Sequence, residues 1–231
     1  MHTWDEIRTA IRQLPVDQRW KVEACLRELD GSSIPESQVR EARPAYAALD
    51  PSAMTFKEFF ELEQTSPLRH EFVNGAIFAL SDSSLNHCSI RQNLTFAIHA
   101  HLRRNPWKVF SLVKLVIRRD LSTMSYYPDV IVDCNPDTRD TFFVRDPKLI
   151  AEVLSASTEL IDRREKLLNY RLIDSLEEYV LVSQDERHVV VYPRAERWKP
   201  RIYAGLDTAV ELRSIDLTIP LIELYQDVQS P

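Results

Sequence analysis

The stretch Leu149-Ile150-Ala151-Glu152-Val153-Leu154 is the part of this chain that says most about its fold. Apart from Glu152, all of its residues are apolar, so the segment predicts a β-strand that is buried on both faces. Burying a carboxylate costs free energy unless the group is paired, protonated or bound to a metal ion. Glu152 therefore indicates a functional site or, as the plainer alternative, the open face of a half-exposed strand.

A second carboxylate lies near the start of another apolar segment. A strand is predicted over residues 126–133, and Asp129 follows Pro128 directly in front of the run Val130-Ile131-Val132. Two carboxylates on neighbouring strands suit one hard cation, because Mg²⁺ in proteins takes one or two carboxylates together with water and substrate phosphate. Pro-Asp is also an ordinary beginning for a strand, so this pair leaves both interpretations open.

The helix predicted over residues 160–172 carries a third set of polar residues. Asp162, Lys166 and Tyr170 follow one another at intervals of four, so they line one face of that helix. If this face covers the edge of the sheet, Lys166 reaches the same pocket as the two carboxylates. The alternative is a solvent-exposed Asp–Lys pair that contributes little to stability.

The neighbouring segments predict an α/β fold with a mixed sheet flanked by helices. Asn74-Gly75 lies between two β-prone runs and predicts a hairpin over residues 70–79, because both turn positions need positive φ. Apolar spacing predicts helices over 54–64 and 86–104, and further strands are predicted over 107–118, 178–183 and 188–192. Strands and helices alternate without strict repetition, which is typical of a mixed sheet.

The first part of the chain predicts a separate unit. Residues 1–30 contain two short amphipathic patterns that meet at Pro15, and they predict an N-terminal helical hairpin. Residues 31–53 are polar and interrupted by proline, which is typical of a linker, so the main domain is predicted over 54–231. The hairpin is expected either to pack on the main domain or to mediate a homodimer.

Composition excludes several classes of function. Cys25, Cys88 and Cys134 show no paired spacing, which argues against a zinc cluster or a disulfide framework and favours the reducing cytoplasm. No apolar run approaches membrane-spanning length, so we expect no membrane partner. With three glycines, the sequence has no glycine-rich phosphate loop of an NTPase. The net charge of −6 counts against strong non-specific nucleic-acid binding, although a carboxylate metal site itself adds negative charge.

Together these residues resemble a known nuclease signature. Pro128-Asp129 followed by Glu152-Val153-Leu154 is similar to the PD-(D/E)XK motif, with Leu154 at the position of the motif's lysine. In many members that lysine has moved to the next helix, where Lys166 stands here. More closely, residues 54–225 resemble the Uma-two family of restriction-endonuclease-like proteins. The matching stretches are residues 69–75, His87, and residues 127–130, 152–158, 162–170 and 178–182.

This resemblance implies a restriction-endonuclease-like fold and hydrolysis of phosphodiester bonds in DNA with Mg²⁺ or Mn²⁺. It implies metal ligands at Asp129, Glu152, Glu71 and the Val153 carbonyl. It also implies catalytic roles for Asp129, Glu152, Glu71 and Lys166, with Lys166 holding the attacking water or stabilising the transition state. The family has a second acid directly after the hairpin glycine, whereas this chain has Ala76, which weakens the case for the hairpin.

Three further residues of the matched stretches, His87, Asp162 and Tyr170, are expected to contact the substrate. His87 opens a helix, where a neutral imidazole is suited to hydrogen-bond a site carboxylate or a phosphate; a structural histidine is the alternative. Candidates for phosphate contacts on or beside the two helices are Arg91, Arg103, Arg104, Arg163 and Arg164, although helix arginines are more often simply solvated. The alternative to a nuclease is a protein that keeps the nuclease fold without cleaving, as a nucleic-acid-binding or assembly protein.

Overall fold

The computed structural model describes residues 54–80, 83–119, 122–135, 142–155, 158–205 and 207–229. The hairpin and the linker predicted over 1–30 and 31–53 lie outside these residues, so both stay predictions. The described helices are α4 (Phe56–Thr65), α5 (Leu85–Leu102), α6 (Glu159–Ile161), a π-helical turn (Asp162–Lys166), α7 (Leu167–Tyr170) and α8 (Leu221–Leu224). The described strands are β1 (His70–Val73), β2 (Ala76–Ala79), β3 (Lys108–Phe110), β4 (Lys114–Arg119), β5 (Ser122–Tyr126), β6 (Val130–Asp133), β7 (Phe143–Val144), β8 (Pro147–Leu154), β9 (Glu178–Ser183), β10 (His188–Pro193), β11 (Arg201–Ala204), β12 (Ala209–Leu212) and β13 (Leu217–Pro220).

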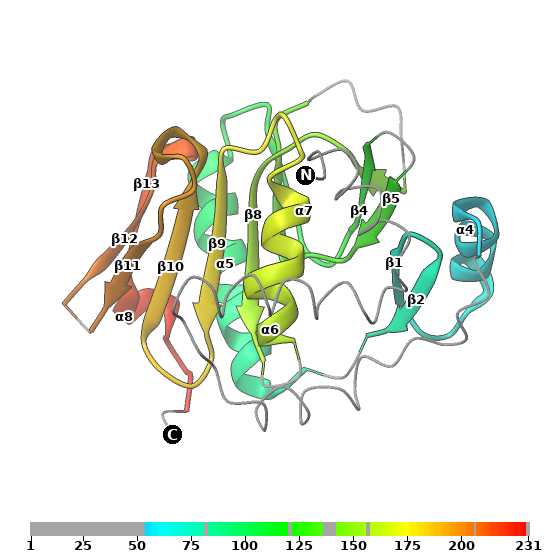
Figure 1. Ribbon diagram of the computed structural model, residues 1–231. Helices are drawn as coiled ribbons and strands as arrows, with labels where there is room; N and C mark the ends of the chain where they lie inside the picture. Colours follow the sequence, from blue (N-terminus) through cyan, green and yellow to red (C-terminus); the bar gives the residue numbers. More distant parts are fainter. Residues whose placement is uncertain are drawn as a thin grey trace, which may run out of the picture. The chain divides into compact units, whose positions relative to one another are not determined.

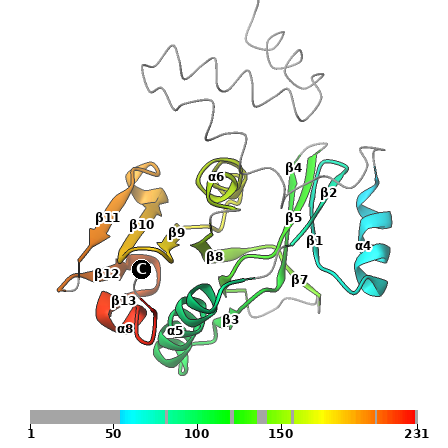
Figure 2. The ribbon, with the colours of Figure 1, turned by 90° about the horizontal axis from the view of Figure 1, so that it is seen from below.

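The central sheet has six strands in the order β11-β10-β9-β8-β6-β3 (Figure 1). β8 and β9 run parallel, and the other neighbouring pairs are antiparallel. α5 covers one face of this sheet, and the helix that runs from α6 to α7 covers the other (Figures 1 and 2). The predicted mixed α/β sheet with flanking helices is confirmed, and β8 is almost wholly apolar because it lies between two layers.

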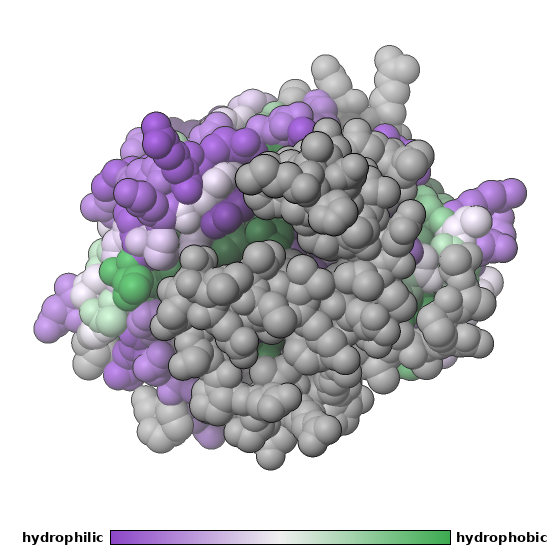
Figure 3. All heavy atoms as spheres, in the orientation of Figure 1, coloured by the Kyte–Doolittle hydropathy of each residue, from purple (hydrophilic) through white to green (hydrophobic). Residues whose placement is uncertain are grey.

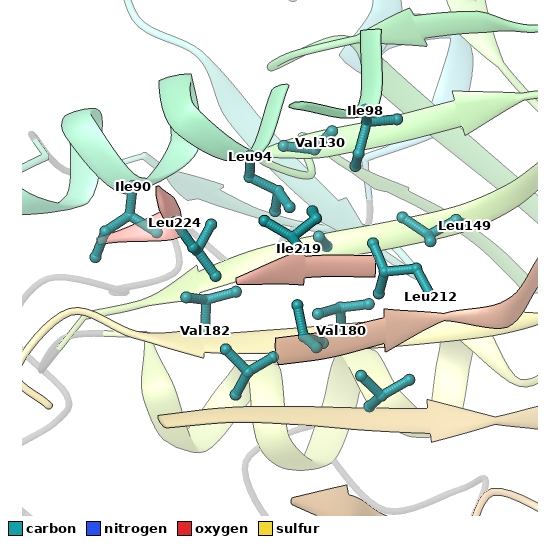
Figure 4. Close-up of a cluster of buried hydrophobic side chains, with 14 of the residues drawn as sticks. Ile90, Leu94, Ile98, Val130, Leu149, Val180, Val182, Leu212, Ile219 and Leu224 are labelled. Atoms are coloured by element: carbon teal, nitrogen blue, oxygen red, sulfur yellow. The ribbon is translucent and has the colours of Figure 1, made fainter. Parts of the chain in front are cut away.

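The side chains of β8 alternate between two hydrophobic cores. The core beneath α5 includes Leu149, Ala151 and Val153 of β8 together with Ile90, Leu94 and Ile98 of α5 (Figure 4). Ile150 and Leu154 belong to the second core, which α7 and strands of the second sheet complete. Glu152 lies two residues from each of these, so the strand period directs it toward that second core. Its burial follows from the layer that covers this face.

Two of the predicted strands are divided between two sheets, so the prediction of continuous strands was wrong. The segment 107–118 forms β3 in the central sheet and β4 in the second sheet, whose order is β2-β1-β5-β4-β7. The segment 126–133 likewise divides between β5 and β6. The chain changes sheet at Leu112, whose φ of 52° is uncommon for a residue other than glycine, and at Pro128, which has no N–H for a ladder. The Leu112 N–H donates to the Pro128 carbonyl at 3.1 Å, so the two crossing points lie side by side.

The hairpin predicted over 70–79 and the helix predicted over 54–64 are confirmed. Asn74 and Gly75 form the turn between β1 and β2 with φ angles of 49° and 101°, as the Asn-Gly pair predicts. α4 begins with a capping box, in which the Thr55 side chain accepts from the Glu58 N–H and the Glu58 carboxylate accepts from the Thr55 N–H. These short-range interactions need no tertiary contact to be recognised.

On the face in Figure 3, hydrophilic residues cover most of the described surface, and the apolar residues form small groups among them. Small apolar groups of this kind are ordinary on a folded protein. None of the helices in the described ranges is long and apolar enough to span a membrane.

Candidate active site

Strand pairing places two of the predicted site residues side by side. β6 and β8 are antiparallel with Val130 opposite Ala151, so one further step in the same register brings Asp129 opposite Glu152. The Val153 N–H donates to the Asp129 Oδ2 at 2.8 Å, and the Asp129 N–H donates to the Glu152 Oε2 at 3.2 Å. Both carboxylates are buried. The sheet register therefore holds them at one place in defined orientations.

Lys166 reaches this pair from the helix on the same face of the sheet. Its ammonium nitrogen lies 3.2 Å from the Glu152 Oε1, 3.1 Å from the Glu71 Oε1 and 3.0 Å from the Asp162 Oδ1. An ammonium group has three N–H donors, and three carboxylates surround it here. With a side chain that is 6% exposed, Lys166 is a buried counter-charge and not half of a solvated Asp–Lys pair.

The helix that carries Lys166 includes the π-helical turn Asp162–Lys166. Such turns are rare and occur frequently at functional sites. Tyr170 donates its O–H to the Glu152 Oε1 at 2.8 Å, and Tyr179 of β9 donates its O–H to the Asp162 carbonyl at 3.0 Å. One face of the helix thus presents Asp162, Lys166 and Tyr170 to the site, in the order that their spacing predicts.

Glu71 comes to the site from the hairpin of the second sheet. Its side chain is fully buried, it contacts Lys166, and it accepts a hydrogen bond from the Tyr127 N–H at 3.4 Å. Ala76 stands directly after the hairpin glycine. The hairpin therefore supplies one carboxylate to the cluster. This carboxylate contacts Lys166 and the backbone of the segment that leads to Asp129.

α5 directs two basic side chains at Asp129. The His87 Nε2 lies 3.3 Å from the Asp129 Oδ2, and the Arg91 Nη1 lies 3.5 Å from the Asp129 Oδ1. The two residues are four apart and share one face of the helix. The sequence indicated Arg91 only as one of five helix arginines. Its spacing from His87 is the signal that could have singled it out.

Burial raises the pKa values of two acids in the cluster, where carboxylates outnumber the single lysine among them. Burial raises the pKa of Glu152 well above its usual value; Lys166 offsets part of this rise, whereas Asp162, Asp129 and Glu71 add to it. Burial also raises the pKa of Asp162. Burial alone would lower the pKa of Lys166, but the carboxylates around it raise this pKa well above its ordinary value. The ammonium therefore stays charged at neutral pH, and one lysine faces several acids.

Comparison with known proteins identifies the family. A family model described as "Uma2: Putative restriction endonuclease" matches residues 56–222. The chain belongs to the Uma2 family. Two uncharacterized proteins of Synechocystis sp. are similar to it. One, slr1290, is 32% identical over 175 residues, which cover 74% of this chain and 90% of that protein. The other, sll1609, is 33% identical over 135 residues, which cover 57% of this chain and 75% of that protein.

A solved structure shares the fold of this Uma2 protein. It is described as a "putative nuclease belonging to DUF820" from Anabaena variabilis. The TM-score is 0.65 at 18% sequence identity, and the match covers 76% of this chain and 99% of that chain. At this identity the likeness establishes the fold alone. The restriction-endonuclease-like fold and the family membership that the sequence predicts are confirmed.

The donor set of the Uma2 site suits a hard divalent cation. Asp129 and Glu152 supply carboxylate oxygens, and burial raises the pKa of Glu152, a rise that a neighbouring cation would oppose. Within the described residues, no three Asp, Glu, His or Cys side chains form a group that could hold a metal ion. Mg²⁺ keeps several waters and needs only one or two carboxylates from the protein. Asp129 and Glu152 therefore fit such an ion. Glu71 contacts Lys166 and does not form a three-carboxylate group with them.

A second buried network supports the segment that carries Asp129, and sequence reasoning missed it. Tyr127 donates its O–H to Glu63 of α4, and the same carboxylate lies 2.8 Å from the His70 Nδ1 and 3.8 Å from the Lys114 Nζ. The Lys114 ammonium also lies over the rings of Phe59, Phe60 and Tyr127, at 5.3, 4.9 and 5.7 Å from their centroids. The network joins residues from several elements, so no local spacing could have revealed it.

Proposed function

We propose that this Uma2 protein is a metal-dependent endonuclease that hydrolyses phosphodiester bonds of DNA. One observation carries the proposal: Asp129, Glu152 and Lys166 come from three separate segments of the chain and meet in one buried cluster. Buried carboxylates beside a buried lysine cost free energy to assemble, which is typical of functional sites. The family's description and the nuclease fold support the same reading of the chemistry.

Asp129 and Glu152 would hold Mg²⁺ or Mn²⁺, and the Val153 carbonyl would add a third ligand. When bound, such an ion polarises the scissile phosphate and lowers the pKa of a bound water. The chain's own contacts prepare these ligands. The Val153 N–H orients Asp129, while the Tyr170 O–H and the Asp129 N–H orient Glu152. Ligands that are held in place need no reorganisation during the reaction.

Lys166 acts in this proposal as a fixed positive charge. Its pKa is raised by Asp162, Glu152 and Glu71, which together outweigh the effect of burial, so it keeps its proton and does not serve as a general base at neutral pH. The ammonium would hold the attacking water or stabilise the negative charge that develops on the phosphate. To do so it exchanges one of its three carboxylate contacts for the water or the phosphate. Glu71 would orient the water or hold a second ion.

The contacts of the three predicted substrate-binding residues suggest positioning roles. His87 contacts Asp129, Tyr170 donates to Glu152, and Asp162 contacts Lys166. Each of these contacts orients a ligand or the lysine. In this proposal the three residues act on the DNA indirectly, by orienting the site groups that they contact.

Cleavage of supercoiled plasmid and of single-stranded DNA with Mg²⁺ or Mn²⁺ tests the proposal. The variants are Asp129→Asn and, as a matched control, Asp185→Asn, since Asp185 is exposed in the turn before β10. Loss of a direct ligand should lower the rate by more than the about 10- to 100-fold typical of residues that only support a ligand. Asp185→Asn should cleave like the wild type.

Absence of metal-dependent cleavage by the wild type on both DNAs would overturn the proposal. So would equal cleavage by wild type and Asp129→Asn, because the activity would then not belong to this site. In the first case, the hypothesis to test is a nucleic-acid-binding protein that does not cleave. Binding assays with the same DNAs would test it.

A further inference from the structure

Arg91 is the most exposed charged group at the candidate site. Its side chain is 15% exposed, against 6% for Lys166 and 7% for Asp129. Its described contacts are long: 3.5 Å from the Nη1 to the Asp129 Oδ1, and 3.7 Å from the Nη2 to the Cys88 sulfur. Contacts at these distances are weak. A guanidinium has five N–H donors, so most of the binding capacity of Arg91 is not used by them.

Lys166 differs from Arg91 in this respect. It has three carboxylate oxygens within 3.0–3.2 Å, all of them in buried side chains. An anionic ligand that approaches Lys166 must displace a short, buried ion pair. An anionic ligand that approaches Arg91 displaces one long contact with Asp129. Arg91 is therefore the cation of the site that can accept a new anion at least cost.

The backbone beneath Arg91 is firmly held. Ile90 and Leu94 of the same helix are buried in the core with β6 and β8, and the Ser84 side chain caps the helix at the His87 N–H. Arg91 thus stands at a defined distance from the Asp129–Glu152 pair. A side chain on a rigid helix orders a ligand more precisely than one on a loop.

We propose that Arg91 binds a phosphate of the nucleic-acid substrate next to Asp129, and that it exchanges Asp129 for this phosphate when a divalent cation takes over the charge of Asp129. The planar guanidinium matches phosphate oxygens with two parallel hydrogen bonds, which an ammonium cannot do. This inference rests on the proposed function and adds a substrate-binding residue to it. It makes Arg91 a competitor of the metal ion for Asp129 and a partner of the substrate.

These two roles predict opposite effects of one substitution. The variants are Arg91→Met, Arg91→Lys and the control Lys199→Met, since Lys199 is an exposed basic residue that follows β10 and has no assigned role at the site. Mn²⁺ alone, titrated by calorimetry, should bind Arg91→Met about fivefold tighter than the wild type, because a neighbouring positive charge has been removed. A fluorescein-labelled DNA duplex in Ca²⁺ should bind Arg91→Met at least about tenfold more weakly, with the DNA checked for intactness afterwards.

The remaining variants separate charge from geometry. Arg91→Lys should recover only part of the DNA affinity, because it keeps the charge and loses the two-pronged contact. Lys199→Met should leave Mn²⁺ affinity and DNA affinity within about twofold of the wild type, since exposed charges are screened. A structural role for Arg91 would weaken both affinities together, and that result overturns the inference. Unchanged DNA affinity in Arg91→Met overturns it as well.

The outcome is distinguishable from that of the proposed function. If the wild type cleaves DNA and Arg91→Met binds DNA normally, the nuclease function is supported and the proposed role of Arg91 is refuted. If the wild type never cleaves, but Arg91→Met binds Mn²⁺ more tightly and DNA more weakly, the phosphate contact is supported and the nuclease function is refuted. Binding is measured without turnover, so neither result depends on the other.

Discussion

Replacing Lys166 by methionine would test whether its ammonium is the counter-charge of the site. Three carboxylates lie within 3.0–3.2 Å of this nitrogen, and the side chains of all four residues are at most 6% exposed. Removing one partner of a buried ion pair costs about 3–5 kcal/mol, because a buried charge is left without compensation. We therefore expect Lys166→Met to lose at least about 3 kcal/mol of unfolding free energy at pH 8. For a domain of this size that loss lowers Tm by about 6–12 °C.

The loss should shrink at lower pH. Without the ammonium, Glu152 and Asp162 keep the burial that raises their pKa values and lose the positive charge that partly offsets this rise. Above about pH 4 the folded variant then holds more protons than its unfolded chain, so its stability falls as pH rises. Lys166 itself adds no slope between pH 5 and 8. Its pKa is raised above an already high ordinary value, so its stabilisation is fully present throughout that range.

The assay is urea and thermal unfolding followed by circular dichroism, at pH 5.5 and pH 8 in EDTA. Lys199→Met is the matched control, since Lys199 is exposed, and it should stay within about 0.5 kcal/mol of the wild type. The double variant Lys166→Met with Glu152→Gln should recover part of the loss, because one uncompensated acid is removed. A loss below about 1 kcal/mol at pH 8, or an equal loss at both pH values, would refute the reasoning.

Two further predictions concern the network behind Asp129. Burial lowers the pKa of Lys114, and Glu63 only partly offsets this. Just below the ordinary lysine pKa, the unfolded chain then binds more protons than the folded protein. The stability of the wild type relative to Lys114→Met, measured by urea unfolding, should therefore rise from pH 8 to pH 10. A constant difference would contradict this prediction. Tyr127→Phe removes the O–H that Tyr127 donates to Glu63, and it should cost about 1–3 kcal/mol in the same assay, whereas a change under about 0.5 kcal/mol would argue against a structural role for this bond.

Short-range patterns predicted most of the elements around the site. The turn at Asn74-Gly75 follows from the positive φ that both residues tolerate, and α5 follows from apolar residues at helical spacing. The division of segments 107–118 and 126–133 between two sheets did not follow. Leu112 adopts a positive φ that its residue type does not favour, and it is held there by the Pro128 carbonyl. Tertiary contacts therefore overrode a local preference at that crossing.

The candidate site shows the same boundary between local and long-range information. The sequence alone determined that Glu152 interrupts an apolar strand and that Asp162, Lys166 and Tyr170 share a helix face, because strand and helix periods are local properties. It could not determine that Asp129 stands opposite Glu152. That depends on the register of β6 against β8, and the packing of distant residues in both cores sets it.

Only the tertiary structure decided which charges meet. Lys166 faces three acids because the hairpin, β8 and the helix converge on it, and Arg91 meets Asp129 because α5 packs across β6 and β8. Charge pairing of this kind depends on separations of a few ångström between residues far apart in the chain. A sequence pattern sets which side chains share a face, and only packing sets which faces come together.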